Sequence, residues 1–496
     1  MRSWLTLPRL AVALVFLGIF AMAARPSVDT DTWWHLRAGA WMLEHGQVLT
    51  RDVFSSTRYG TFWLNVNWLS QIGLALVWRA GGFAGLNMLT AALVTVAFIF
   101  VYLQCEGNAY LRAFTLVLAA AASAVFWSAR PQLASFGLAS VFAYVLHAYR
   151  RPGRNYLWTL PPLMLLWANL HGGFAIGFLL LGATLAGEAA GRMLFPAQTD
   201  GLGWRGLGAL ALTTAACGAA VAVNPFGLRL YGIPFQTVSI GVLQDYIQEW
   251  QSPNFHLPAA QVFIWLQLAT FGAVGLGRRR LDLTDLLLFG GFTFLALLAG
   301  RNISIVALLA PPIITRHTAA ALAELRARRP RLAAVLDPSP APNRLPLVNW
   351  ALLSVVALAV LVKVADAALP KANDQLLRRQ SPVDAVAYLQ REQPPGPLFN
   401  SYNWGGYLLW ALYPQYPVFV DGRTDLYEND LLSAYLTTAA GRAGYAELLD
   451  ERGINLVLIE TESALTARLA QSGAWRVLYA DDMATVYQRD RLMGTP

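Results

Sequence analysis

Two neighbouring stretches decide how this sequence folds: Leu10-Ala-Val-Ala-Leu-Val-Phe-Leu-Gly-Ile-Phe-Ala-Met-Ala-Ala24 and Asp29-Thr-Asp-Thr-Trp-Trp-His-Leu-Arg37. The first is apolar throughout and, with its flanks, approaches the ~20 residues that a helix needs to cross a membrane. Similar segments recur, since hydrophobic residues make up 56% of the 496 residues, charged residues only 13%, and the mean hydropathy is +0.44. Ordinary soluble proteins and disordered chains do not have this composition. The sequence therefore predicts a polytopic α-helical membrane protein.

Apolar segments that could cross the membrane occur along most of the chain. We expect eleven spans, near residues 5–24, 84–104, 112–129, 132–149, 156–170, 173–191, 206–223, 258–277, 283–299, 302–315 and 346–365. A cleaved signal peptide is the alternative for the first segment, and it leaves residue 25 onward on the same outer side.

Arginine clusters indicate the orientation of these spans. With Arg2 and Arg9 in the cytoplasm, alternation also places there Arg112, the Arg150, Arg151 and Arg154 group, Arg192 with Arg205, Arg278–Arg280, and the run from Arg316 to Arg331. Cytoplasmic loops collect Lys and Arg, so the formal net charge of +8 reflects topology and gives no reason to expect nucleic acid. Arginine-rich, lysine-poor usage is typical of GC-rich bacterial genomes. We therefore expect a bacterial inner-membrane protein with a cytoplasmic N-terminus.

Two domains follow from this topology. Residues 1–366 form the transmembrane domain, with large outer loops at 25–83 and 224–257, and residues 367–496 form a periplasmic domain. In this last part, Val-, Ile- and Tyr-rich runs predict strands at 397–400, 418–421, 455–460, 475–479 and 484–488. Helices fit at 382–392, 406–413, 431–439, 445–452 and 463–472, which predicts a partly parallel α/β sheet domain. The first outer loop contains two further amphipathic segments, 33–45 and 68–78, expected at the membrane interface.

The acidic pair after the first span is the first candidate for chemistry. Asp29 and Asp31 are two residues apart, a spacing at which carboxylates can share a divalent cation or hold and deprotonate a nucleophile. Trp33 and His35 beside them suit a sugar's apolar face. In the alternative interpretation, one aspartate caps the helix that begins near Trp33.

The segment Asp31-Thr-Trp-Trp-His-Leu-Arg37 resembles the Asp-x-aromatic-x-x-x-Arg motif of the oligosaccharyltransferases and of the wider GT-C glycosyltransferase superfamily. Those enzymes transfer a sugar from a polyprenyl phosphate or diphosphate carrier outside the membrane and combine many spans with a C-terminal outer domain. The resemblance implies that Asp31 is the catalytic carboxylate, with Asp29 as its helper and Arg37 among the groups that bind the donor phosphate. The family's second acidic motif has only loose counterparts in Asp245 and Glu249. Together with Asp31 they could hold Mg²⁺ or Mn²⁺, or they could belong to a solvated loop.

Polar residues at the outer ends of spans are candidates for binding a lipid phosphate. Arg301 lies where two apolar runs meet, and Arg130 occupies the matching end of an earlier hairpin. Guanidinium groups there can pair with phosphate, or can simply snorkel to the interface. His171 lies at a third boundary and could contact substrate, or could close a turn through a backbone hydrogen bond.

The C-terminal domain contributes a candidate acceptor site. Trp404 and Tyr407 lie in Ser401-Tyr-Asn-Trp-Gly-Gly-Tyr407, and Asp421 and Arg423 lie in Val418-Phe-Val-Asp-Gly-Arg-Thr-Asp-Leu-Tyr427. This region is similar to the acceptor-recognition region of oligosaccharyltransferases but lacks its Trp-Trp-Asp core, so a protein acceptor is not implied. In the alternative, Trp404 and Tyr407 pack a helix, and Asp421 and Arg423 form a local salt bridge.

Three functions are compatible with these features. The first is a membrane glycosyltransferase that uses a polyprenyl-phosphate-linked sugar, the second a non-catalytic scaffold or lipid-glycan binding protein of the same fold, and the third a transporter or flippase. Charges gather at span boundaries and not along a path through the bundle, which favours the first two over the third.

Overall fold

The computed structural model describes residues 5–26, 29–151, 153–196, 201–239, 241, 247–277, 279–331 and 346–490. The chain divides into two compact units. The membrane unit comprises Met1–Arg25, Ala84–Tyr231 and Gln248–Leu369, and the tail unit comprises Pro26–Phe83, Gly232–Ile247 and Pro370–Pro496.

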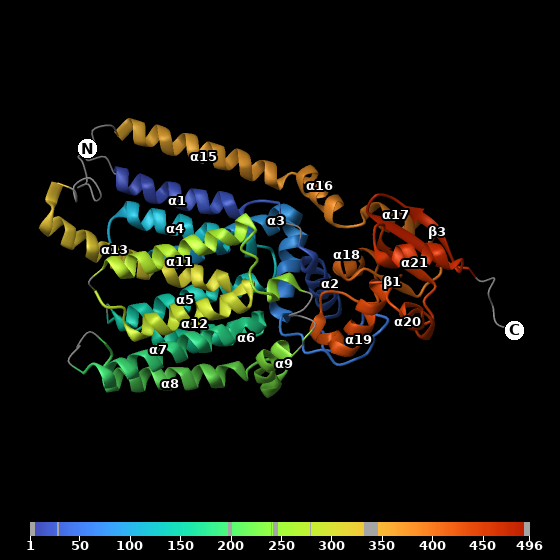
Figure 1. Cartoon of the computed structure of the whole chain (residues 1–496), viewed down its shortest axis with the longest axis horizontal. Helices are drawn as coiled ribbons and strands as arrows, with labels where there is room; N and C mark the ends of the chain where they lie inside the picture. The colour runs from blue at the N-terminus through green and yellow to red at the C-terminus, as the bar shows by residue number, and fades with distance from the viewer. Residues whose placement is uncertain are drawn as a thin grey trace. The chain divides into compact units, whose positions relative to one another are not determined.

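Long apolar helices lie side by side in the membrane unit (Figure 1). They are α1 (Leu7–Ala23), the second part of α3 (Trp68–Tyr102, kinked at Gly82), α4 (Ala109–Ser123), α5 (Gln132–Arg150), α6 (Leu160–Leu170), α7 (Ala175–Leu194), α8 (Trp204–Val221), α11 (Pro258–Leu276), α12 (Leu283–Leu298), α13 (Ile303–Arg328) and α15 (Pro346–Ala368). Helices satisfy all their backbone groups internally, as a lipid environment requires. Each of the eleven predicted spans coincides with a helix in the described part of the chain, and six of these helices are long and apolar enough to cross a membrane by themselves. The protein is therefore a polytopic helical membrane protein, as predicted.

Helix α13 forms the centre of this bundle, and α15 lies at its edge. Most side chains from Ile303 to His317 are buried, because α13 packs against α4, α5, α11 and α12. By contrast, α15 contacts α1 and leaves nearly all of its apolar surface exposed, which is expected of a helix surrounded by lipid.

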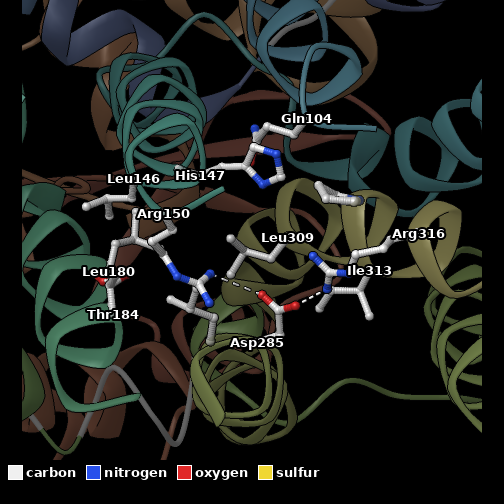
Figure 2. A pocket seen from close by; sticks show the side chains of 13 residues that line it. Gln104, Leu146, His147, Arg150, Leu180, Thr184, Asp285, Leu309, Ile313 and Arg316 are labelled. Atoms are coloured by element: carbon white, nitrogen blue, oxygen red, sulfur yellow. Dashed lines mark hydrogen bonds and ion pairs between the residues drawn. The ribbon is translucent and has the colours of Figure 1, made fainter. Parts of the chain in front are cut away.

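Charged side chains are buried at one end of the bundle, where α5, α7, α12 and α13 meet (Figure 2). Asp285 on α12 pairs with Arg316 on α13 and accepts hydrogen bonds from Arg150 (3.4 Å) and Arg151 (3.3 Å). Glu188 on α7 accepts from Arg150 Nε at 2.6 Å. Arg150, Asp285 and Arg316 line a cavity of about 40 Å³. Arg316, expected in a cytoplasmic loop, thus lies inside the bundle, because α13 continues to Arg328.

A four-stranded mixed sheet organises the tail unit. Its strands are β1 (Leu398–Asn400), β2 (Leu456–Glu460), β3 (Trp475–Ala480) and β4 (Ala484–Arg489), in the order β1-β2-β4-β3, and only the β1–β2 pair is parallel. Around it lie α16 (Pro370–Gln380), α17 (Val383–Glu392), α18 (Tyr402–Leu412), α19 (Thr424–Ala439), α20 (Tyr445–Glu451) and α21 (Ala464–Ser472). Four of the five predicted strands are confirmed.

The fifth predicted strand, 418–421, is wrong. Val418 forms an isolated bridge with Ser55, and the hydrogen-bonding groups of this segment are used outside the sheet. Phe419 N–H donates to Asn400 Oδ1 (2.7 Å), and Val418 pairs with Phe54 and Ser56 of the first loop. A short apolar run predicts a strand without specifying its partner.

The first loop folds together with the C-terminal region. Helix α2 (Thr30–His45) packs on α18, and the contact is so close that a β-carbon on Gly406 would overlap the Thr30 carbonyl. The loop expected as an appendage of the transmembrane domain therefore belongs to the tail unit.

Candidate functional site

The two aspartates at the start of α2 have different surroundings. Asp29 is the N-cap, and its Oδ1 accepts a hydrogen bond from Asp31 N–H at 3.0 Å. The alternative interpretation, in which an aspartate caps this helix, therefore holds for Asp29. Asp31, in the first helical turn, is half-buried, and its Oδ1 accepts from Trp34 Nε1 at 3.1 Å. The Asp31 carboxylate is therefore held by a neighbouring indole and is not used to cap its helix.

Gly422 of the C-terminal region lies directly against Asp31. A β-carbon at Gly422 would overlap Asp31 Oδ1 and come within 2.9 Å of Trp34 Nε1. Only glycine lets the backbone approach this closely. Sequence reasoning singled out the Asp421 to Arg423 turn but could not predict that it lies beside Asp31.

A buried ion-pair network fixes this turn. The Arg423 guanidinium donates to Asp421 Oδ2 and to Asp52 Oδ1, each at 2.6 Å, and all three side chains are inaccessible to solvent. Burial alone would lower the pKa of Arg423, but Asp421, Tyr427 and Asp52 raise it well above its usual value. The predicted Asp421–Arg423 salt bridge is therefore present. The burial of both side chains favours this structural role over the predicted contact with an acceptor.

The aromatic residues predicted to contact substrate form the packing between α2 and α18. Trp33 lies edge-on to Tyr407, with 5.5 Å between ring centroids, and Trp404 is also buried. His35 is buried against Trp34, with its Nδ1 3.3 Å from Gln71 Nε2. These four predicted substrate contacts therefore lie in the core of the tail unit.

Arg37 lies farther along α2. Its guanidinium pairs with Glu44 at 3.2 Å and is 5.0 Å from the ring centroid of Tyr413. Its predicted contact with phosphate stays a prediction.

In the membrane unit, Arg130 and Arg301 meet at one carboxylate. Arg130 donates to Glu249 Oε2 at 3.0 Å, and Arg301 lies 3.6 Å from Glu249 Oε1. The Arg301 guanidinium also stacks over Trp250, 4.3 Å from the ring centroid. Backbone pairing explains the arrangement, because Gly300 N–H donates to Gln251 C=O at 2.9 Å and joins the two turns. Two arginines predicted from separate span boundaries are thus neighbours.

Electrostatics favour an ionised Glu249. Burial alone would raise its pKa, but Arg301 and Arg130 lower it below the usual value. Glu249 was predicted as a low-ranking metal ligand with Asp31 and Asp245. Its oxygens contact arginines, and Asp245 lies outside the described residues. Among the residues that the structure describes, no group of three or more His, Cys, Asp or Glu side chains is arranged to hold a metal ion.

His171 lies close enough to this cluster to interact with it electrostatically. It occupies the turn after α6, where Ser135 Oγ lies 2.7 Å from its Nδ1 and Trp167 Nε1 donates to Ser135 Oγ at 2.7 Å. The backbone hydrogen bond of the turn alternative is also present, from Gly173 N–H at 3.1 Å. Sequence reasoning missed Ser135 and Trp167, because only helix packing brings them to His171.

No protein-family model and no curated protein sequence matches the chain. Solved structures do. The oligosaccharyltransferase AglB from Archaeoglobus fulgidus, in complex with an inhibitory peptide and a dolichol-phosphate, is similar with a TM-score of 0.57 and 12% identity, covering 98% of this chain and 74% of AglB. ArnT from Cupriavidus metallidurans is similar with TM-scores of 0.51 bound to undecaprenyl phosphate and 0.52 in the apo state, at 14% identity and with 98% of both chains covered. Because the similarity extends over nearly the whole length, this polytopic membrane protein has the fold of the GT-C membrane glycosyltransferases.

Proposed function

We propose that the protein is a GT-C glycosyltransferase that takes a sugar from a polyprenyl-phosphate-linked donor and passes it to an acceptor outside the cytoplasmic membrane. The observation that carries the proposal is the Arg130–Glu249–Arg301 cluster, in a chain whose fold is similar over its length to an ArnT bound to undecaprenyl phosphate. A guanidinium pair is well suited to a phosphate, because it offers several charge-assisted hydrogen bonds in fixed directions.

Arg130 and Arg301 bind the donor phosphate in this proposal. Their side chains are half-buried, so a phosphate beside them is only partly screened by water. Glu249 satisfies both guanidinium groups before the donor arrives and keeps them near each other. As the bond between the sugar C1 and the phosphate oxygen breaks, negative charge grows on the phosphate, and the arginines stabilise it.

Asp31 acts on the acceptor as a general base. The acceptor hydroxyl oxygen forms a bond to the sugar C1, its proton passes to the Asp31 carboxylate, and polyprenyl phosphate leaves with the bonding electrons. A single displacement of this kind inverts the configuration at C1. The hydrogen bond from Trp34 and the contact with Gly422 hold the carboxylate in one orientation, which a positioned base requires. A divalent ion at Asp31 would instead activate the hydroxyl by polarising it.

The decisive experiment measures donor turnover. The purified protein in lipid nanodiscs is incubated with a panel of undecaprenyl-phosphate-linked hexoses, with and without Mn²⁺, and both free and transferred sugar are quantified. We expect Asp31→Asn to lose at least about 100-fold in turnover and to keep its affinity for undecaprenyl phosphate. Asp430→Asn, at an exposed position of the tail unit, is the matched control and should stay active.

Two other outcomes would replace this proposal. Binding of undecaprenyl phosphate without turnover of any donor would indicate a lipid-glycan binding protein. Movement of the lipid between the two leaflets of a proteoliposome membrane, without sugar transfer, would indicate a flippase.

A further inference from the structure

A line of hydrogen bonds in the membrane unit ends at His171. It begins at the indole of Trp167 on α6, passes through the hydroxyl of Ser135 on α5, and reaches Nδ1 of His171. Trp167 and Ser135 are both buried, so water does not compete for these bonds. Gly173 completes the arrangement, because a β-carbon there would come within 2.7 Å of His171 Nδ1.

The direction of each hydrogen bond in this line is determined. An indole N–H only donates, so Ser135 Oγ accepts from Trp167. The backbone N–H of Gly173, also only a donor, points at His171 Nδ1, so this nitrogen carries a lone pair. A nitrogen with a lone pair can only accept, so Ser135 Oγ directs its own hydrogen to Nδ1. The proton of the neutral ring is therefore on Nε2.

The surroundings keep this ring neutral. Burial, Arg301 and Arg130 together lower the pKa of His171 to about 3, against the opposing effect of Glu249. A protonated imidazole would repel both arginines, whereas a neutral ring offers an N–H group without adding charge. The ring therefore supplies a hydrogen-bond donor whose protonation does not change near neutral pH.

We propose that His171 is a third ligand of the phosphate that Arg130 and Arg301 bind, and that Trp167 and Ser135 are positioning residues which fix its Nε2–H tautomer. This inference rests on the proposed function for the identity of the phosphate. It adds a neutral donor to a cationic site, which strengthens phosphate binding without increasing the repulsion between cations in the empty site.

The tautomer can be measured directly. The protein is labelled with ¹⁵N-histidine in nanodiscs, and the His171 signals are assigned by their loss in His171→Gln. We expect a protonated Nε2 and an unprotonated Nδ1 from pH 5.5 to 7.5. A protonated Nδ1, or an imidazolium in this range, would overturn the proposal.

Binding titrations test whether His171 contacts the phosphate. One series uses undecaprenyl phosphate and a parallel series uses inorganic phosphate. His171→Ala should weaken binding by about 10- to 100-fold, the loss of one hydrogen bond to a charged group. His171→Gln, which can place an amide N–H near the position of Nε2, should restore most of it. Ser135→Ala should weaken binding less and change the His171 ¹⁵N signature. Ser140→Ala, at another buried serine of α5, should change neither.

The pH dependence of phosphate affinity distinguishes a neutral His171 donor from a cationic one. Among the described residues, the charged groups that act on His171 are Arg130, Arg301 and Glu249. Protonation of the phosphate itself affects wild type and His171→Gln equally, so it cancels in the ratio of their affinities. We expect this ratio to be constant from pH 5.5 to 7.5. A ratio that rises tenfold toward acid pH would show a cationic histidine and contradict the proposal.

Arginine variants distinguish an error about His171 from an error about the donor site as a whole. If His171→Ala binds phosphate as wild type does while Arg301→Gln does not, His171 is not a ligand, and the proposed function stands. If Arg301→Gln and Arg130→Gln also bind normally, the donor site itself is wrongly assigned.

Discussion

The carboxylate of Asp31 rests against the backbone of Gly422, although the two residues come from nearly opposite ends of the chain. The contact leaves no space for a side chain at residue 422. The C-terminal region thus forms part of the immediate surroundings of the proposed base.

Gly422→Ala should therefore reduce turnover strongly. The new methyl group displaces the Asp31 carboxylate or the Trp34 indole, and a misplacement of about 1 Å can cost ~100-fold in rate. Steady-state turnover of the donor measures the effect. Gly73→Ala, in the same unit but with open space at its Cβ position, is the control and should be unaffected. Normal turnover in Gly422→Ala would argue against catalysis by Asp31.

Loss of Arg423 should destabilise the tail unit. Arg423→Met leaves Asp52 and Asp421 buried without their cation, a change that typically costs about 3–5 kcal/mol. Thermal unfolding followed by tryptophan fluorescence should show a lower midpoint than wild type. Arg442→Met, at an exposed position, should leave the midpoint unchanged. Equal midpoints in the two variants would mean that the network does not hold the fold together.

Asp52 makes the tail unit sensitive to acid. Burial alone would raise its pKa, but Arg423 and the hydrogen bonds from Ser55 and Phe54 lower it below the usual value. A carboxyl whose pKa is lower in the folded state stabilises the fold above its unfolded pKa, and this contribution is lost as the pH falls through the folded pKa. Asp52→Asn should be less stable than wild type at pH 7, and the difference should shrink below about pH 4. Unfolding midpoints of wild type and Asp52→Asn, measured from pH 7 to below pH 4, test this prediction. A stability difference that grows as the pH falls would contradict a lowered pKa for Asp52.

Removal of Glu249 should tighten phosphate binding. The carboxylate competes with phosphate for the two guanidinium groups, so Glu249→Gln frees them. We expect the affinity for undecaprenyl phosphate to rise about 3- to 10-fold, which corresponds to roughly 1 kcal/mol. Arg112→Gln, a charge change in α4, serves as the control. Weaker binding in Glu249→Gln would show that Glu249 mainly orients the arginines.

Asp285 should be essential for the membrane unit. Asp285→Asn leaves the buried Arg316 without its carboxylate partner, which is expensive inside a helical bundle. The yield of folded protein in detergent and its melting midpoint should both fall, whereas Asp366→Asn at an exposed site should behave as wild type. Unchanged folding of Asp285→Asn would indicate that the remaining ion pairs suffice.

Periodicity and composition predicted the helices well, because lipid allows few alternatives to an apolar helix. Arg130 and Arg301 could be selected because each is an isolated arginine at the outer end of a span, apart from the arginine clusters assigned to the cytoplasmic side. The surroundings of Arg423 could not be predicted. A sequence does not show whether an arginine in a loop faces solvent or is enclosed by Asp52 and Asp421, because their pairing depends on contacts between distant segments. The hydrogen bond between Ser135 and His171 could not be predicted either, because it also joins segments that are distant in the sequence.

The discontinuous tail unit has a consequence for biosynthesis. Residues 26–83 leave the ribosome early, but their packing partners in 370–490 are made only after the described membrane helices. Until then Trp33 lacks its ring contacts with Tyr407 and Trp410, and the first loop must remain soluble or be shielded by a chaperone. A chain interrupted before residue 422 would hold Asp31 without its glycine neighbour. The proposed chemistry would thus be switched on only after the turn at Gly422 has been translated and has folded against Asp31.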